Sequence, residues 1–365
     1  MIEILQQRVR KLREAIRHAG IDGLLIVDPK NVSYLTGFLG EDSWALVAGR
    51  QTVLLTDSRY VEQARQECPS CRIVLRKTTL TDSVAQVVAR SPGLRTLGVE
   101  PGISVEIYGL LRNKVAARLK PVGGLTEGLR QIKDAGEVRR IRRAAATAWE
   151  ALAEVLPRFR PGVSESAVAG MIEYAIRLRG MKSSFDPIVC FGPNGSRNHH
   201  QPGSRKLKTN DTILIDFGAK GQGYICDLTR SFAVGKSSAR YRKAWQAVYD
   251  AQQKGIGMIA PGADTQAIDA AIRKVIADSG FPVFGHGSGH GIGLAVHEAP
   301  FLSPIRKGKL QTGQVLTIEP GIYLPGEFGI RIEDDIRVTE NGHQVVSHDW
   351  LHGFSGDSLP TLKTR

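Results

Sequence analysis

Acidic residues and one histidine occupy positions in the second half of the chain that apolar strands or glycine loops are expected to bury. Burying carboxylates without partners is prohibitive in free energy, and Arg331 can neutralise only one of them. Divalent cations resolve the problem, since an oxygen-rich set with a single imidazole suits Mn, Co, Fe or Zn better than a thiolate-type zinc site. The sequence therefore predicts two divalent metal ions that share bridging carboxylates. The candidate ligands are Asp216, Asp227, His290, Glu319 and Glu333.

The first two candidates flank a Gly-Gln-Gly turn. Apolar residues on either side of this turn, within LIDFGAKGQGYICDLTR (214–230), predict a β-hairpin with a glycine-first type II′ turn. With Lys220 opposite Gly223, counting outward places Asp216 opposite Asp227 on one face, with Cβ atoms about 4.5–5.5 Å apart. Such a pair calls for a positive partner. For this pair taken alone, the alternative is two surface acids.

The other candidates come from three later segments, expected to be a loop at 285–300 and strands at 314–324 and 329–342. Glu319 ends the apolar run VLTI. In the last segment, strand alternation is expected to place Arg331, Glu333 and Asp335 on one face and isoleucines on the other.

The composition is typical of a soluble protein that is large enough for two domains. The chain has 365 residues, of which 42% are hydrophobic and 23% are charged. No apolar run approaches the roughly 18 residues of a membrane span, and the N-terminus lacks the apolar segment of a signal peptide. A cytoplasmic protein without a membrane partner is expected.

Four cysteines do not make a disulfide framework in a chain of this length. Cys68 and Cys71 have the spacing of a redox pair or of half a metal site. No second such motif exists, so the simpler interpretation is a helix end running into a strand. Cys190 and Cys226 are expected to be small buried hydrophobic residues.

The formal net charge of +13 raises the question of nucleic-acid binding. Lysines and arginines are spread along the chain, without a basic tail or an RNA motif interleaved with aromatic residues. The densest cluster, Arg139, Arg140, Arg142 and Arg143, lies in a helical stretch and is most simply a solvated face. No nucleic-acid partner is expected.

Two domains are predicted from the order of the elements. Strands alternate with helices in residues 1–133, which predicts an α/β domain with a mixed or parallel sheet. Strands and helices are grouped in residues 134–365, which predicts an α+β domain that holds all the candidate ligands. The expected helices include 105–119 in the first domain and 165–179, 239–259 and 265–279 in the second.

The order and local context of the candidate ligands resemble the "pita-bread" metallopeptidases, most closely aminopeptidase P and prolidase (Xaa-Pro dipeptidase). The motifs are the aspartate hairpin, GHGIG, IEPGIY and RIEDD. The resemblance covers nearly the whole chain, because residues 1–133 are similar to the creatinase-type N-terminal domain of that branch. It implies that Asp216 and Asp227 chelate one ion, that Asp227, His290, Glu319 and Glu333 hold the other, and that Asp227 and Glu333 bridge the two.

The resemblance also implies roles for two histidines. His297 is expected to hydrogen-bond the scissile carbonyl, and His199 to lie near the scissile nitrogen. Relatives usually have a proline before that loop histidine, whereas Asn198 precedes it here and His200 follows. Which of the two adjacent histidines faces the site stays open.

Further polar residues are candidates for supporting positions. Arg331 and Thr229 are expected to orient ligand carboxylates. Tyr224 is a candidate to reach the site, with simple packing in the hairpin as the alternative. His286 is a candidate to line the same pocket, with an ordinary loop histidine as the alternative.

The implied activity is metal-assisted hydrolysis of the peptide bond before proline. Water between two metal ions has a pKa near about 7, the metals and His297 stabilise the oxyanion, and Glu319 shuttles the proton as in the family. Proline nitrogen carries no hydrogen and its ring fixes φ, so a pocket shaped for the ring gains specificity. The expected substrates are peptides with proline at the second position, and a homodimer is expected because dimers are common in the family.

Three alternatives compete with this interpretation. Methionine aminopeptidase shares the five ligands but normally lacks a domain like residues 1–133. Creatinase shares the layout but lacks the metal carboxylates. A non-enzymatic scaffold on the same fold is the rival of a different class, and intact ligands speak against it. The sequence leaves open dipeptidase against aminopeptidase, the physiological peptide, the oligomer, and the metal, with Mn as first candidate over Co, Zn or Fe.

Overall fold

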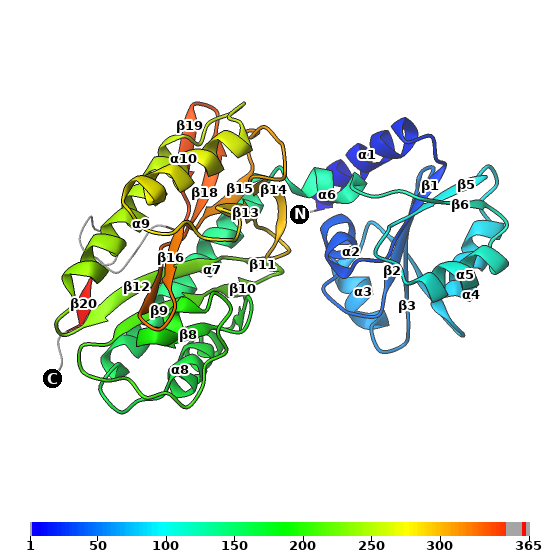
Figure 1. Cartoon of the computed structure of the whole chain (residues 1–365). Coiled ribbons are helices and arrows are strands. Elements are labelled where there is room, and N and C mark those ends of the chain that lie inside the picture. Colours follow the sequence, from blue (N-terminus) through cyan, green and yellow to red (C-terminus); the bar gives the residue numbers. More distant parts are fainter. Residues whose placement is uncertain (1, 348–359, 363–365) are drawn as a thin grey trace. The chain divides into compact units, whose positions relative to one another are not determined.

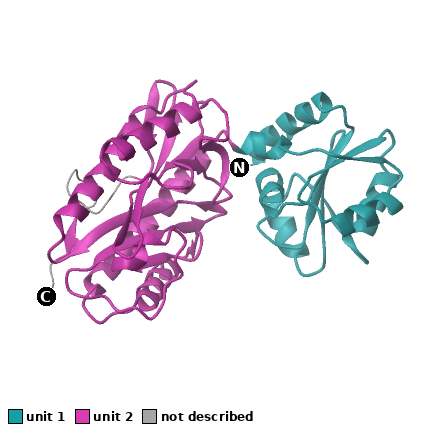
Figure 2. Cartoon of the chain, in the orientation of Figure 1, with its two compact units in different colours: residues 1–130 teal, residues 131–365 magenta. Residues whose placement is uncertain are grey.

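A computed structural model describes residues 2–347 and 360–362, and the contacts divide the chain into two compact units, residues 1–130 and 131–365 (Figure 2). The division expected from the sequence lies a few residues later, between 133 and 134. The second predicted domain also includes residues 348–359 and 363–365, which lie outside the described residues.

The first unit is a mixed β-sheet with helices packed on it (Figure 1). The strands lie in the order β4-β3-β2-β1-β5-β6. β2 runs antiparallel to both of its neighbours, β1 and β3, whereas β4 joins β3, β5 joins β1 and β6 joins β5 in parallel. Every residue of β1 is buried, as its central position requires. The elements are α1 (Ile2–His18), β1 (Gly23–Ile26), α2 (Pro29–Thr36), β2 (Trp44–Ala48), β3 (Gln51–Thr56), α3 (Val61–Glu67), β4 (Arg72–Leu75), α4 (Leu80–Ala89), β5 (Thr96–Val99), α5 (Val105–Lys114), β6 (Arg118–Pro121) and α6 (Leu125–Arg130).

Two local expectations fall in this unit. The helix expected over 105–119 is wrong at its end, because α5 stops at Lys114 and the chain turns to pair β6 with β5. The interpretation of the CxxC spacing as a helix end running into a strand is confirmed: α3 ends at Glu67, β4 begins at Arg72, and the Cys71 N–H donates to the Cys68 carbonyl at 3.0 Å.

The second unit consists of two halves, each a helix pair packed on a curved sheet (Figure 1). In one half, α7 and α8 pack against β20-β12-β9-β8, and in the other, α9 and α10 pack against β14-β13-β15-β18-β19 and the pair β16-β17. A smaller sheet, β11-β10-β7, lies beside α7. The elements are α7 (Ala135–Val155), η1 (Leu156–Arg158), α8 (Glu165–Leu178), β7 (Lys182–Ser183), β8 (Ile188–Phe191), η2 (Gly192–Ser196), β9 (Thr212–Phe217), β10 (Ala219–Gly221), β11 (Tyr224–Ile225), β12 (Leu228–Val234), α9 (Ala239–Gly257), α10 (Thr265–Asp278), β13 (Gly289–Gly291), β14 (Glu298–Leu302), β15 (Val315–Ile318), β16 (Gly321–Leu324), β17 (Phe328–Arg331), β18 (Asp334–Thr339), β19 (Gly342–Val345) and β20 (Thr361–Leu362).

Helix α7 illustrates how the sequence forms these layers. Asp134 and Glu137 make a capping box that satisfies the first free amides of the helix. Ala145, Trp149 and Leu152 recur at helical spacing on the buried face and enter the core of the α7–α8 half. The α9–α10 half has a core of its own, so the candidate ligands are carried by two separately packed layers.

Two long strands expected from the sequence are each broken in the structure. The segment 314–324 forms β15 and β16, with Glu319 and Pro320 between them, and the segment 329–342 forms β17, β18 and the start of β19. Proline explains the first break, since it has no N–H to continue the ladder. The loop expected at 285–300 contains the short strand β13 and the start of β14.

Among the helices of the described residues, none is long and apolar enough to cross a membrane.

Candidate metal centre

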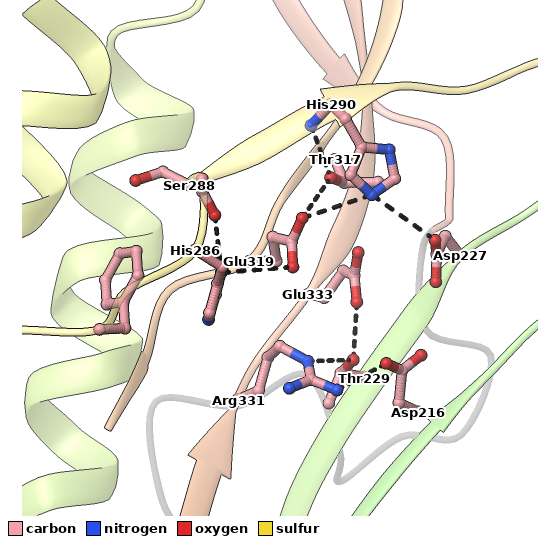
Figure 3. Close-up of polar contacts among 12 residues, drawn as sticks. Asp216, Asp227, Thr229, His286, Ser288, His290, Thr317, Glu319, Arg331 and Glu333 are labelled. Carbon is pink, nitrogen blue, oxygen red and sulfur yellow. Dashed lines mark hydrogen bonds and ion pairs between the residues drawn. The ribbon is translucent and has the colours of Figure 1, made fainter. Parts of the chain in front are cut away.

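The side chains of Asp227, His290 and Glu333 converge on one buried point (Figure 3). One ligand atom from each lies within 4.8 Å of the others. Glu319 approaches the same point, with Oε1 3.3 Å from Nε2 of His290. Asp216 lies beside this group on β9 and is bound to Arg331. The structure thus brings the predicted ligands together in one region of the second unit.

Interruptions in the strands place these ligands. Asp227 lies between β11 and β12, Glu319 between β15 and β16, and Glu333 between β17 and β18. His290 stands at a register shift in the pairing of β13 with β14. A residue at such a break is released from strict alternation, so its side chain can turn toward a common centre.

The predicted register of the aspartate hairpin is wrong. Gly221 pairs with Tyr224, and Asp216 pairs with Thr229 rather than with Asp227. The turn residues are Gln222 and Gly223, with φ of 50° and 86°, which is the type I′ pattern. A shift of two residues preserves the face of a strand, so both aspartates still point to the same side.

Arg331 and Thr229 hold the acids in place. Nη2 of Arg331 donates to Oδ2 of Asp216 at 2.6 Å, and its Nε donates to Oγ1 of Thr229 at 3.1 Å. The Thr229 hydroxyl in turn donates to Oε2 of Glu333 at 2.6 Å. The remaining guanidinium nitrogen, Nη1, donates to the Tyr323 hydroxyl at 2.8 Å. The Arg331 guanidinium therefore orients Asp216 directly and Glu333 through the Thr229 hydroxyl.

The electrostatics of this cluster favour bound cations. Burial, followed by repulsion from neighbouring carboxylates, raises the pKa of Asp227 and Glu333 well above their ordinary values. Burial also raises the pKa of Glu319 to about 8. Oδ1 of Asp216 is buried and has no hydrogen-bond partner among the described atoms. Divalent cations would offset these costs together, so the residues present fit a metal site.

His290 is prepared to act as a neutral ligand. Burial lowers its pKa to about 3. Its Nδ1 lies 3.2 Å from the Gly291 carbonyl, an acceptor that fixes the proton on Nδ1. Nε2 then carries the lone pair, and it faces Asp227 at 3.8 Å and Glu319.

A pocket of about 720 Å³ opens over the cluster. Its walls are largely apolar, and they include Phe185, Ile188, Val296 and Phe301. This volume suits a small peptide rather than a folded protein.

The histidines of this pocket fall into different environments. His297 lines it with its ring centroid 4.4 Å from that of His290. His199 lines it as well, and after burial its charge is the next cause that lowers the pKa of His297. His200 is anchored, because its Nε2 lies 2.9 Å from Oε2 of the fully buried Glu165. Both adjacent histidines line the pocket, and of the two His200 is the one tied to Glu165.

Other expected residues lie differently. Tyr224 does not line this pocket, and its hydroxyl donates to Oε1 of Glu137 at 2.7 Å, so the packing alternative describes it better. The expected alternation persists across the break after Arg331: Ile330, Ile332 and Ile336 enter the core of the α9–α10 half, whereas Arg331 and Glu333 both contact Thr229. Oδ2 of Asp335 accepts the backbone N–H of Asp227 at 3.2 Å.

Several supporting residues have no signal in the sequence. The Tyr323 hydroxyl bonds both Arg331 and Nε2 of His286, at 2.8 and 2.9 Å. His286 therefore lines the pocket with its ring fixed by the hydrogen bond to Tyr323. Lys133 and Glu298 form a buried ion pair of 2.6 Å directly after His297. Partners so distant along the chain are invisible to local patterns. The position of Glu298 beside His297 was the one available hint.

Comparisons with known proteins agree with this geometry. Residues 139–340 match the model of metallopeptidase family M24, and residues 8–132 match the Creatinase/Prolidase N-terminal domain. The chain belongs to metallopeptidase family M24. The fold expected from the resemblance, a creatinase-type domain followed by a pita-bread domain, is thereby confirmed.

Three M24 relatives span nearly the whole chain. YqhT of Bacillus subtilis, an uncharacterized peptidase, is 39% identical over 347 residues, 93% of this chain and 98% of that protein. The Xaa-Pro dipeptidase of Pyrococcus horikoshii is 30% identical over 350 residues, 95% and 98% of the two chains. The solved structure of an Xaa-Pro dipeptidase from Bacillus anthracis has a TM-score of 0.93 and 36% identity, covering 98% of this chain and 100% of that chain.

Proposed function

We propose that this M24 protein is a metal-dependent exopeptidase that cleaves the bond before a proline at the second position of a peptide. The observation that carries the proposal is the buried group of Asp227, His290 and Glu333 at the base of a largely apolar pocket. Relatives that extend over nearly the whole chain are named Xaa-Pro dipeptidases, which supports the same substrate class.

Two divalent ions are proposed for this site, with Mn as first candidate over Co, Zn or Fe. Asp216 and Asp227 would hold one ion, and Asp227, His290, Glu319 and Glu333 the other. Bound there, the ions supply Lewis acidity and make hydroxide available near neutral pH. Arg331 and Thr229 keep the carboxylates oriented through the hydrogen bonds described above.

The chain's own groups handle the proton and the substrate. We assign donation to the scissile carbonyl to His297 and donation to the departing nitrogen to His199, which is supported by the position of both histidines in the pocket lining and of His297 beside His290. We assign the transfer of the proton to Glu319, a role supported by the position of its Oε1, 3.3 Å from Nε2 of His290 in the proposed metal centre.

The pocket walls suit proline. The apolar side chains of Phe185, Ile188, Val296 and Phe301 can surround a ring that offers no N–H for hydrogen bonding. Peptides with a free amide at that position gain nothing from such a wall.

One residue of the pocket favours the dipeptidase over the aminopeptidase. Arg306 stacks over the Phe301 ring, with Cζ 4.1 Å from the centroid. It has no acidic partner in the described part of the chain, in contrast to Arg331, which is occupied by Asp216. A guanidinium that lines the pocket beside its apolar wall suits the free carboxylate of a dipeptide.

The alternatives carried from the sequence are less favoured. A methionine aminopeptidase-like enzyme does not require the creatinase-type domain that residues 8–132 match. A scaffold protein does not require a buried, oriented acid cluster. A cytoplasmic homodimer remains part of the proposal, and light scattering on the purified protein tests the dimer.

Hydrolysis assays test the proposed function. The purified protein is loaded with Mn, Co or Zn, and rates are measured on Ala-Pro, Ala-Pro-Ala and Ala-Ala. The expected result is cleavage before proline, slow turnover of Ala-Ala, and loss of both metal and activity in Asp227→Asn. Exposed Asp250→Asn is the matched control and should behave as the parent protein. Absence of turnover with every metal would favour the scaffold.

A further inference from the structure

A second pocket differs from the pocket over the metal centre in its lining, which includes four arginines. It has a volume of about 520 Å³, and no acidic side chain lines it among the described residues. Arg139, Arg140 and Arg143 come from α7, and Arg179 follows the end of α8. The lining is completed by Gly136, Gly180, Met181, Gly221 and Gln222.

The four guanidinium groups gather from separate segments, so their clustering is more than a charged helix face. α7 lies against β10 and β11 (Figure 1), which brings the hairpin tip at Gln222 beside the helix. Nε of Arg140 donates to Oε1 of Gln222 at 3.3 Å, and its Cζ lies 5.3 Å from the Tyr224 ring centroid. Arg140 is thus held in place at the edge of the pocket.

The charges of this pocket are incompletely compensated. Arg179 contacts Glu150 and Glu154 at 3.3 and 2.9 Å, whereas Arg139 and Arg143 have no ion-pair partner in the described ranges 2–347 and 360–362. Arg139 and Arg143 are four residues apart on one helix, a spacing at which like charges repel. A bound anion would relieve that repulsion.

We propose that this arginine pocket binds a small anion that carries two or more phosphoryl or carboxylate groups, an interaction beyond the proposed peptidase activity. Guanidinium groups form paired hydrogen bonds with phosphate and carboxylate, and several of them around one concavity match a multiply charged anion. The volume and the concave shape of the pocket suit a small molecule better than the flat surface of a protein partner.

Calorimetric titration of the full, metal-loaded protein with pyrophosphate, and separately with citrate, tests the proposal at fixed ionic strength. The test variant is Arg139→Ala/Arg143→Ala. The matched control is Arg142→Ala, which removes an exposed charge from the same helix outside the pocket. We expect saturable binding by the parent, binding within about twofold of the parent in the control, and at least about a tenfold weaker affinity in the double variant. Arg143→Lys keeps the charge but loses the paired N–H donors of the guanidinium, so its affinity should lie between those of the parent and the double variant.

The variants also distinguish binding in this pocket from binding to the metal ions. Pyrophosphate or citrate bound at the metal centre should keep its affinity when the α7 arginines are replaced. Binding of pyrophosphate alone would identify phosphoryl ligands, and binding of both anions would identify any small polyanion. Equal affinities in the double variant and in Arg142→Ala would overturn the proposal. So would binding of hexaglutamate without binding of either small anion, since that result would assign the pocket to an acidic protein segment.

Discussion

The hydroxyl of Thr229 donates a 2.6 Å hydrogen bond to Oε2 of Glu333, a residue 104 positions later in the chain. The Thr229 hydroxyl oxygen also accepts a hydrogen bond from Nε of Arg331. A single buried hydroxyl therefore connects β12 to the break between β17 and β18, and it fixes which oxygen of Glu333 remains free for a metal ion.

Thr229→Val should weaken metal binding while leaving the shape of the side chain nearly unchanged. The loss of a partner that orients a ligand typically costs about 10–100-fold in metal affinity. Calorimetric titration of metal into chelator-treated protein measures the effect. Thr229→Ser keeps the hydroxyl and should bind nearly as the parent does; an equally weakened serine variant would contradict the role of the hydrogen bond.

Glu333→Gln should have opposite effects on metal content and on cation-free stability. Metal content should fall, because a proposed bridging carboxylate is lost. The chelator-treated variant should be more stable than the chelator-treated parent above neutral pH, because a buried charge that is repelled by Asp227 has been removed. Elemental analysis and thermal unfolding check the two effects, with the exposed Glu327→Gln as control. A less stable cation-free variant would contradict the electrostatic account.

The free energy of unfolding should depend more strongly on pH without metal than with metal. In the cation-free protein the pKa of Glu319 is about 8, and the pKa values of Asp227 and Glu333 are well above their ordinary range. The folded state then holds protons that the unfolded chain releases above about pH 4.5, so the free energy of unfolding falls as pH rises toward 8.

Bound metal keeps these carboxylates ionised in the folded state, so the part of the fall that they cause should be absent from the metal-loaded protein. Glu100, whose pKa burial raises to about 7, contributes equally to both forms and cancels in the difference. Thermal unfolding of both forms across this pH range is the measurement. Parallel profiles would argue against metal at these residues.

Gly289→Ala should damage the metal centre through the backbone. A Cβ at Gly289 would stand 2.0 Å from the Thr317 carbonyl oxygen, so β13 must move away from β15 and take His290 with it. We expect a loss of about 2–3 kcal/mol in unfolding free energy together with reduced metal content. Gly285→Ala, where no atom lies within 4 Å of the added Cβ, is the matched control and should be close to neutral.

Arg306→Ala should separate dipeptides from longer substrates. If its guanidinium receives a dipeptide carboxylate, KM for Ala-Pro should rise roughly tenfold while kcat changes little, and Ala-Pro-Ala should be affected less. Lys307→Ala, an exposed neighbour that does not line the pocket, is the control. A uniform loss on both substrates would point to a structural role instead.

The sequence predicted the type of residue at the site better than its geometry. Acids within apolar strands report burial directly, so the candidate ligands were accessible from pattern alone. The hairpin register was not, because Gln222 adopts a positive φ that glutamine rarely favours, and the glycine before it offered an equally plausible turn.

The broken strands show a second limit of local patterns. Pro320 was a readable signal for the break after Glu319, whereas nothing near Ile332 announced the break before Glu333. Contacts such as Lys133 with Glu298, and Tyr323 with His286, depend on how distant segments meet, so the structure was needed to find them.

The two helix-and-sheet halves of the second unit have separate cores, and the candidate metal ligands come from both. Divalent cations bound among these acids would join the two halves at this point, in addition to the contacts that β17 makes with η2 and β12. On warming, a small separation of the two halves would disrupt the metal centre and abolish activity while both cores stayed intact. Inactivation should therefore precede melting, and excess metal should bring the two temperatures together.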